Sequence, residues 1–358
     1  MYKVNLLPQV GDLIKDRYKI VRIISQGEKG IIFCAIDQQM QQIAIKLEKN
    51  SEEQPEILIE SAILKILANS NHIPRFFSYG SHINFKFMAC ELLGPNLIDL
   101  VNYKKPYKFS LHSVLKFGIQ AIETLQIVHN KGFIHRNIKP GNFLIGNTQG
   151  TFGTFYLIGF ELCKKINKHH GVVATPTNKA NFRGTMTYAS LNAHNQIELG
   201  RQDDLISLLY ILVEFYNGML PWSDVDELKI QTLKEYFHGR KLLERLPKQF
   251  LEFESYILSL DYTTDPDYAY LISLLKLAAE ENQIDLNAPF EWEDEINEER
   301  DRIIRHHINY ALKVDWKIEQ LENGKKQIEQ EKQLDSTEKI HQLDKEINKQ
   351  KQSITEEI

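Results

Sequence analysis

Several side chains in the first sixty residues could take part in binding a ligand. Gly27 and Gly30 lie in a predicted turn between two strands, where the absence of a Cβ atom lets the backbone approach a bound group closely. Lys46 follows on the next predicted strand, and Glu60 lies on the predicted helix after it. Each feature alone is ordinary, because glycines often form turns, and lysines on strands and glutamates on helices are common. Further sequence features are needed to show whether these residues form one site.

The predicted elements change in kind along the chain. Alternating apolar and polar residues predict strands, and apolar residues at helical spacing predict helices. The predicted strands cover residues 18–25, 30–37, 42–48 and 85–94, and the predicted helices cover residues 56–68, 111–129, 203–216 and 271–279. Gly94 marks the change from strands to helices. A β-rich first part followed by a mostly helical part predicts an α+β fold with two lobes.

Four longer runs of sequence are more specific than these short patterns. They are ELLGPNLIDL at 91–100, FIHRNIKPGNFLIG at 133–146, the run from Asn181 to Trp222, and DPDYAYLISLL at 265–275. In this order they resemble the hinge, the catalytic loop, the activation-segment end with the central helix, and the late helical region of casein kinase 1, a family of protein kinases. Ser190-Leu191-Asn192, where most kinases carry Ala-Pro-Glu, is similar to casein kinase 1 in particular.

The resemblance covers about residues 16–292 and implies a bilobal protein kinase fold. A small β-rich N-lobe would occupy about residues 16–93, and a larger helical C-lobe would occupy about residues 94–292. Residues 1–15 are then an N-terminal extension, and residues 293–358 are a charged tail that the resemblance does not cover.

The resemblance also implies the remains of a nucleotide site. Ser25 to Ile32 is similar to the Gly-rich loop over the phosphates, with serine in place of the first glycine, and Ala44-Ile45-Lys46 is similar to the third-strand lysine motif. In kinases the pair corresponding to Lys46 and Glu60 holds the lysine on the α and β phosphates. The residual nucleotide-binding positions carried over in this way are Gly27, Gly30, Lys46, Glu60, Glu91, Leu93, Lys139 and Asn142.

At two positions the sequence differs from the family motifs, and each difference removes a catalytic carboxylate. His135-Arg136-Asn137 stands in place of His-Arg-Asp, and the amide of Asn137 cannot act as a base near neutral pH. Gly159-Phe160-Glu161 stands in place of Asp-Phe-Gly, and glycine supplies no oxygen for Mg²⁺. Asn142 and Glu161 would be metal ligands only if they rescued the site, with Glu161 displaced by about 6.5 Å along an extended segment. We therefore expect no functional catalytic residue, no metal and no required cofactor; ATP, if it binds, would bind without Mg²⁺.

Neighbouring positions keep the family pattern. Asp204 on the central helix is expected to hold the catalytic-loop backbone through hydrogen bonds, a role that does not need chemistry. Thr185 also matches its family position. Thr187, in contrast, stands where enzymes of the family usually carry an arginine that recognises a phosphorylated or acidic substrate, so the family's substrate preference is not carried over.

The tail differs in composition from the rest of the chain. The whole formal charge of −5 falls on residues 293–358, where Glu, Lys, Gln and Ile dominate. Apolar residues at a/d-like spacing, from Ile296 to Leu321 and again from Ile340 to Ile354, predict two coiled-coil-like helices with a break between Gly324 and Thr337. The alternative is a polar, partly disordered tail.

Composition argues against several classes of protein. The 43 basic and 48 acidic residues do not form the basic footprint of a nucleic-acid binder. Three widely separated cysteines form no metal or redox pattern, and the N-terminus lacks the apolar run of a signal peptide. The most apolar stretch, Leu205 to Phe215, is too short to span a bilayer and predicts a buried helix. We expect a cytoplasmic protein with neither nucleic-acid nor membrane partners.

Three functions remain open. The first is a catalytically inactive pseudokinase that acts as a scaffold and binds protein partners through the tail and the C-lobe surface; family analogy suggests a cytoskeletal, ciliary or axonemal setting. The second is a weak or unconventional ATP-dependent serine/threonine kinase, which needs a substitute base and a substitute metal ligand. The third is a metal-independent nucleotide-binding module.

Overall fold

The structure, a computed structural model, is described for most of the chain. The described residues are 7–27, 30–50, 56–103, 105–166, 168–169, 172–173, 180–296 and 345. The chain divides into two units, Met1–Glu291 and Trp292–Ile358. The two helices predicted for the tail lie outside the described residues, except for Ile296 and Lys345.

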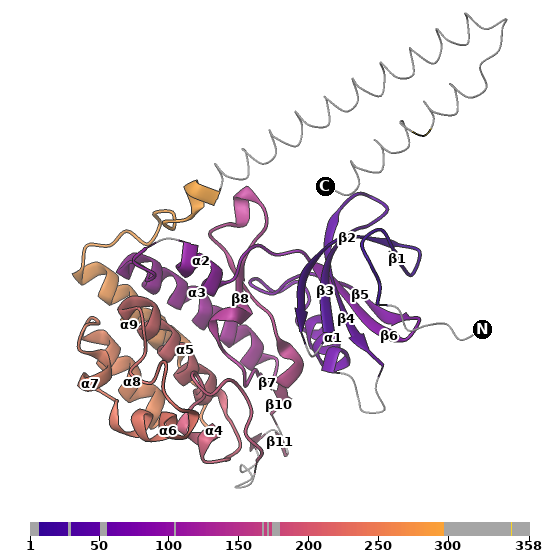
Figure 1. Cartoon of the computed structure of the whole chain (residues 1–358). Helices are drawn as coiled ribbons and strands as arrows, with labels where there is room; N and C mark the ends of the chain where they lie inside the picture. Colours follow the sequence, from indigo (N-terminus) through magenta and orange to yellow (C-terminus); the bar gives the residue numbers. More distant parts are fainter. Residues whose placement is uncertain are drawn as a thin grey trace, which may run out of the picture. The chain divides into compact units, whose positions relative to one another are not determined.

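The first six strands of the chain lie in the N-lobe of the first unit (Figure 1). Among the described residues, an antiparallel six-stranded sheet has the order β1-β2-β3-β4-β6-β5. Its strands are β1 (Leu13–Ile14), β2 (Tyr18–Gly27), β3 (Gly30–Ile36), β4 (Gln42–Lys49), β5 (Phe76–His82) and β6 (Phe85–Glu91). All four predicted strands are confirmed, whereas β1 and β5 were not predicted.

The register of this sheet separates a core face from a face that can hold a site. Phe33 on β3 pairs with Ile45 on β4, which pairs with Ala89 on β6, and all three are buried in one apolar core. The next position along β4 is Lys46, which lies opposite Ile32 and Met88. Because successive side chains of a strand point to opposite faces, this row faces away from that core.

Helix α1 (Glu56–Ile66) follows the sheet and carries Glu60 on its buried side. The carboxylate of Glu48 on β4 accepts hydrogen bonds from the backbone N–H groups of Glu56 and Ile57, at 3.1 and 2.9 Å. A carboxylate at a helix N-terminus satisfies N–H groups that have no partner within the helix. This contact holds the start of α1 against the strand that carries Lys46.

Helices make up most of the C-lobe of the first unit (Figure 1). They are α2 (Leu97–Tyr103), α3 (Leu111–Asn130), α4 (Leu191–His194), α5 (Arg201–Asn217), α6 (Glu227–Tyr236), α7 (Arg240–Leu243), α8 (Gln249–Ser259) and α9 (Tyr268–Glu281). Helix α5 is buried on nearly all sides, which confirms the buried helix predicted for Leu205 to Phe215. Among the described residues, no helix has both the length and the apolar character needed to cross a membrane.

Short elements lie between the long helices in sequence and carry much of the candidate site. They are the strands β7 (Phe133–Ile134), β8 (Phe143–Ile145), β9 (Phe155–Leu157), β10 (Lys164–Lys165), β11 (Lys168–His169) and β12 (Val172–Val173), and the 3₁₀ turns η1 (Pro140–Asn142), η2 (Gln149–Thr151) and η3 (Phe160–Leu162). Strand β7 pairs with β10, β8 with β9, and β11 with β12. The α+β architecture with a β-rich N-lobe and a helical C-lobe is therefore as predicted.

Candidate functional site

Lys46 and Glu60, both singled out in the sequence analysis, form an ion pair. Lys46 Nζ lies 2.6 Å from Glu60 Oε2, and Glu60 Oε1 accepts a hydrogen bond from the backbone N–H of Gly159 at 3.3 Å. Burial acts to lower the pKa of Lys46, but the charge and hydrogen bond of Glu60, with smaller contributions from Glu161 and Glu48, raise it above 10.5. The lysine is therefore charged at neutral pH, and the pair connects β4 and α1 with the backbone before η3.

A cavity of about 290 Å³ lies beside this ion pair. The apolar residues of its lining are Ile24, Ile32, Ala44, Leu64, Pro74, Met88, Leu92, Leu93, Leu144 and Ile158. The other lining residues are Lys46, Glu60, Cys90, Glu91, Gly94, Asn142, Gly159 and Glu161. Sequence reasoning did not include Cys90. Burial raises the pKa of its thiol to about 12, so the group is uncharged at neutral pH.

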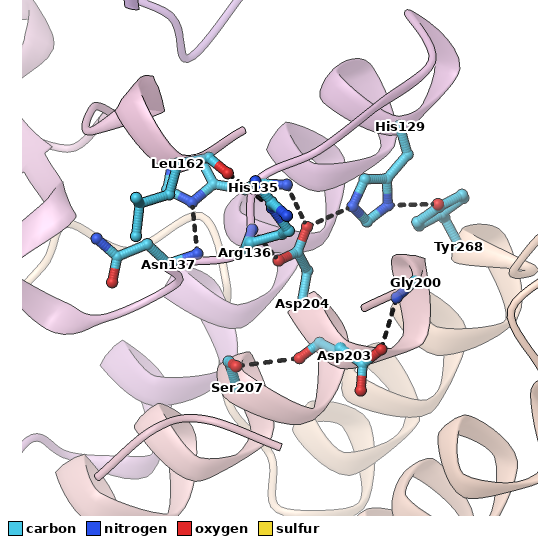
Figure 2. A network of polar contacts seen from close by, with 10 residues as sticks. All are labelled: His129, His135, Arg136, Asn137, Leu162, Gly200, Asp203, Asp204, Ser207 and Tyr268. Atoms are coloured by element: carbon cyan, nitrogen blue, oxygen red, sulfur yellow. Dashed lines mark hydrogen bonds and ion pairs between the residues drawn. The ribbon is translucent and has the colours of Figure 1, made fainter. Parts of the chain in front are cut away.

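A hydrogen-bond network centred on Asp204 positions the loop after β7 (Figure 2). Its Oδ2 accepts from the backbone N–H of His135 and its Oδ1 from that of Arg136, each at 2.8 Å. His129 Nε2 also lies 2.8 Å from Oδ2, and its Nδ1 lies 2.7 Å from the hydroxyl of Tyr268. Burial acts to raise the pKa of Asp204, but these hydrogen bonds and the two histidines lower it. The predicted role of Asp204 in holding the loop is confirmed.

Asn137 follows in the same loop and acts as a hydrogen-bonding residue. Its backbone N–H donates to His135 Nδ1 at 3.2 Å, and its side-chain Oδ1 accepts from the Thr185 hydroxyl at 3.2 Å. Burial lowers the pKa of His135, which keeps the ring neutral so that Nδ1 can accept. Asn137 thus has well-defined partners but, as an amide, no capacity to take a proton from a substrate.

Gly159 has a backbone conformation that few residues other than glycine adopt, and a neighbouring side chain lies close to where its own side chain would begin. Its φ is +82°, in the left-handed region. A Cβ atom there would lie 2.7–2.8 Å from the side-chain amide of Asn142, closer than such contacts allow. That amide is also engaged, because Asn142 Nδ2 donates to the Asn137 carbonyl at 2.8 Å. An aspartate at position 159 would therefore require the end of the Asn142 side chain to move and to give up this hydrogen bond.

The expected geometry of Glu161 is wrong. Glu161 lies in the 3₁₀ turn η3 and not in an extended segment, so it is not displaced along a strand from Gly159. Phe160 at the start of this turn is fully buried, with its ring 5.1 Å from that of His135, which holds the turn in place. Among the described residues, no three His, Cys, Asp or Glu side chains are grouped so that they could hold a metal ion. The residues present do not fit the Mg²⁺ ion that usually accompanies ATP.

The two lobes, the Lys46–Glu60 pair and the loop held by Asp204 agree with a known family. Residues 18–272 match the protein kinase domain. The chain belongs to the protein kinase family. A probable serine/threonine-protein kinase of Dictyostelium discoideum is 39% identical to it over 289 residues, which are 80% of this chain and 58% of that relative. This kinase-domain chain thus spans little more than half the length of that relative.

Other predicted nucleotide-binding positions of this kinase-domain protein lie outside the cavity lining. Gly27 and Gly30 face each other at the ends of β2 and β3, and the two residues between them lie outside the described part. A Cβ atom on Gly30 would overlap the Leu47 carbonyl, so packing on β4 already requires a glycine there. Lys139 precedes η1, and it is not among the described residues that line the cavity. The predicted set is therefore only partly brought together.

A buried lysine that sequence reasoning missed lies beneath the activation-segment end. Lys234 on α6 donates hydrogen bonds to the carbonyls of Met186 and Ala189, at 2.7 and 2.6 Å. Its ammonium also faces the rings of Tyr210 and Trp222, at 5.1 and 5.4 Å from their centres. Burial lowers its pKa to about 7. The helical pattern of α6 gave no signal for this placement, because the partners come from other segments.

Proposed function

We propose that this kinase-domain chain is a casein kinase 1-like pseudokinase, which binds protein partners and does not transfer phosphate. The observation that carries the proposal is the glycine at position 159, which supplies no oxygen for a metal and whose φ of +82° is a conformation that few other residues adopt. A Cβ atom there would lie 2.7–2.8 Å from the end of the Asn142 side chain, so a carboxylate at position 159 would require that side chain to move. Catalysis would then require a different way to neutralise the charge of a transferred phosphate.

The size of the expected loss supports this reading. A positioned base contributes about 10² to 10⁴ in rate, and Asn137 cannot supply one. A metal that neutralises developing charge contributes several kcal/mol, and each ~1.4 kcal/mol is tenfold in rate. Both losses fall on the same step, so together they favour a chain without phosphoryl transfer, even where they do not add fully.

The framework that a docking protein needs is intact. The Asp204 network holds the loop after β7, and the Lys46–Glu60 pair holds β4 against α1. We propose that partners are proteins, bound through the C-lobe surface and through residues 293–358, whose charge and predicted helices suit such contacts. We propose a cytoplasmic, cytoskeletal or ciliary setting from family analogy alone.

A weak or unconventional serine/threonine kinase is the second candidate. Two observations favour it: the ion pair between Lys46 and Glu60 is formed, and a cavity of about 290 Å³ lies beside it. The name of the Dictyostelium relative, probable serine/threonine-protein kinase, also fits this candidate. Nucleotide binding without metal is the third candidate, and it shares the same cavity.

A phosphoryl-transfer assay distinguishes these functions. The purified chain would be incubated with labelled ATP, Mg²⁺ or Mn²⁺ and mixed protein substrates, with Lys46→Met as the background control. The pseudokinase proposal expects no transfer above that control, and reproducible transfer above it would overturn the proposal in favour of the second candidate. Melting temperature with ATP, with and without Mg²⁺, is the companion measurement, because a ligand stabilises by about RT ln(1 + [L]/Kd). A stabilisation that requires Mg²⁺ would mean that a metal site exists.

A further inference from the structure

Helix α6 distributes its side chains in a way that a surface helix usually does not. In most surface helices the apolar side chains face the core and the charged ones face solvent. Here Lys234 is buried together with Ile230, whereas Leu228 is 88% exposed and Tyr236 is 57% exposed. Among the described residues, Leu228 is the most exposed large apolar side chain. The side of α6 that faces solvent therefore keeps apolar surface in contact with water.

The exposed apolar groups of α6 follow one line along the helix. Leu228, Thr232 and Tyr236 are exposed and spaced by four residues, so they lie one turn after another on the same side. We call these three residues the outer face of α6. Lys241 Nζ lies 3.6 Å from the centre of the Tyr236 ring, so a cation covers the C-terminal end of this face. The apolar surface that remains accessible is concentrated at Leu228.

Exposed carboxylates flank Leu228 and give this end of the outer face a negative charge. Glu227 is its neighbour, Glu235 lies seven residues later and so two turns along the same side, and Asp224 lies in the turn just before the helix. From residue 224 to residue 236, all of them described, Lys229 is the one exposed cation. An apolar contact point with a surplus of carboxylates complements a partner that carries apolar and basic side chains.

Contacts on the opposite side of α6 hold this face in a fixed position. Lys234 Nζ donates hydrogen bonds to the carbonyls of Met186 and Ala189, at 2.7 and 2.6 Å. At the start of the helix, the side chain of Asp226 accepts a hydrogen bond from the backbone N–H of Leu228 at 2.9 Å and caps the first turn. A surface that is ordered before binding loses less conformational entropy when a partner docks.

We propose that the outer face of α6 docks a basic, amphipathic segment of a partner protein. An apolar side chain of that segment would cover Leu228, and its lysine or arginine side chains would lie against the flanking carboxylates. The inference rests on the proposed function and names the class of partner for the C-lobe surface. An acidic segment would meet like charges here, which is unfavourable, and a neutral segment would desolvate the carboxylates without pairing them.

A peptide library tests the proposal with a matched control. The library would display random peptides of about 16 residues, which span about 24 Å as a helix. One portion would first be depleted on Leu228→Ser and another on Leu258→Ser, and each would then be selected on the wild-type full chain. Leu258, on α8, is 55% exposed and lies outside the outer face of α6. We expect basic peptides with apolar residues four positions apart to survive depletion on Leu228→Ser and to be removed by depletion on Leu258→Ser.

The affinities of the selected peptides give the size of the effect. In fluorescence polarisation we expect Leu228→Ser to weaken binding about tenfold, or about 1.4 kcal/mol, and Leu258→Ser to leave it unchanged. Raising the salt concentration from about 0.1 M to about 1 M shortens the screening length from about 10 Å to about 3 Å and should weaken binding at least threefold. Asp224→Asn with Glu235→Gln should remove most of this salt dependence. The melting temperature of each variant would be measured first, and the charge variant decides the question if Leu228→Ser does not fold.

Four results would overturn the inference. They are a selection that yields no peptide, selected peptides that are neutral or acidic, binding that is equal in Leu228→Ser and Leu258→Ser, and affinity that salt and the charge variant leave unchanged. A wild-type dimer in sedimentation velocity that Leu228→Ser dissociates would also overturn it, because a second copy of the chain would then be the occupant. Phosphoryl transfer in the assay above would contradict the proposed function instead, so the two failures are distinguishable.

Discussion

Replacing Gly159 by aspartate tests whether the lost metal ligand can simply be restored. The substitution places a side chain at φ +82°, which costs about 1 kcal/mol for a residue other than glycine. Its Cβ would lie 2.7–2.8 Å from the Asn142 amide, which must rotate away and release the Asn137 carbonyl that it now contacts at 2.8 Å. A lost hydrogen bond that leaves a buried acceptor without a partner costs about 2 kcal/mol. We expect a total destabilisation of about 3 kcal/mol.

Gly132→Asp is a matched control for this experiment. Gly132 also has a φ of +82°, but no atom lies within 4 Å of a Cβ added there. The control therefore carries the conformational cost without the contact, and we expect it to lose about 1 kcal/mol. Urea denaturation followed by tryptophan fluorescence gives both free energies of unfolding. The excess of about 2 kcal/mol in Gly159→Asp measures the contact with Asn142.

A double variant extends the test to catalysis. Asn137→Asp with Gly159→Asp restores both family aspartates, but it also forces the Asn142 amide to rotate and release the carbonyl of residue 137, which disturbs the loop that carries one of them. We expect no phosphoryl transfer above the Lys46→Met background. The reasoning would be refuted if Gly159→Asp were no less stable than Gly132→Asp and the double variant transferred phosphate well above that background.

Three further substitutions test the buried charges. Lys46→Met should lower the free energy of unfolding by about 3 kcal/mol, because it leaves the buried Glu60 without its ion-pair partner. Because the pKa of Lys46 is raised above 10.5, this difference should stay constant between pH 6 and 10 and shrink only at higher pH. A difference that already shrinks near pH 8 in urea denaturation would contradict this reasoning. Asp204→Asn should lower the free energy of unfolding, measured by urea denaturation at pH 7, by about 3 kcal/mol. Since the pKa of Asp204 is lowered below 3.8, the difference from the wild type should diminish only as the pH falls below about 4. Burial lowers the pKa of Lys234 to about 7, so between pH 7 and 10 this residue binds more protons in the unfolded chain than in the folded one. The stability of the wild type relative to Lys234→Met should therefore rise with pH over this range. A difference in melting temperature between the two proteins that does not change with pH would argue against a desolvated amine.

The fold of this chain follows in large part from local patterns. Strands β3 and β4 alternate apolar and polar residues, and this period of two already places Phe33 and Ile45 on one face and Lys46 on the other. Helix α5 is apolar over a length that suits a buried helix. The pattern of β5 is weaker, since all its residues are only half-buried, and it was not predicted.

The sequence by itself determined which chemical groups are present: an amide at 137, no side chain at 159 and a carboxyl group at 161. The tertiary structure decided where they lie. The contact between Glu60 and the Gly159 N–H joins residues 99 apart, and the two acceptors of Lys234 lie 48 and 45 residues away. The turn at Gly159 brings Asn142 against position 159 and leaves Glu161 Oε2 buried. Local periodicity encodes which face of an element is buried, but contacts between distant segments depend on how those elements pack, and that is settled only when the whole domain folds.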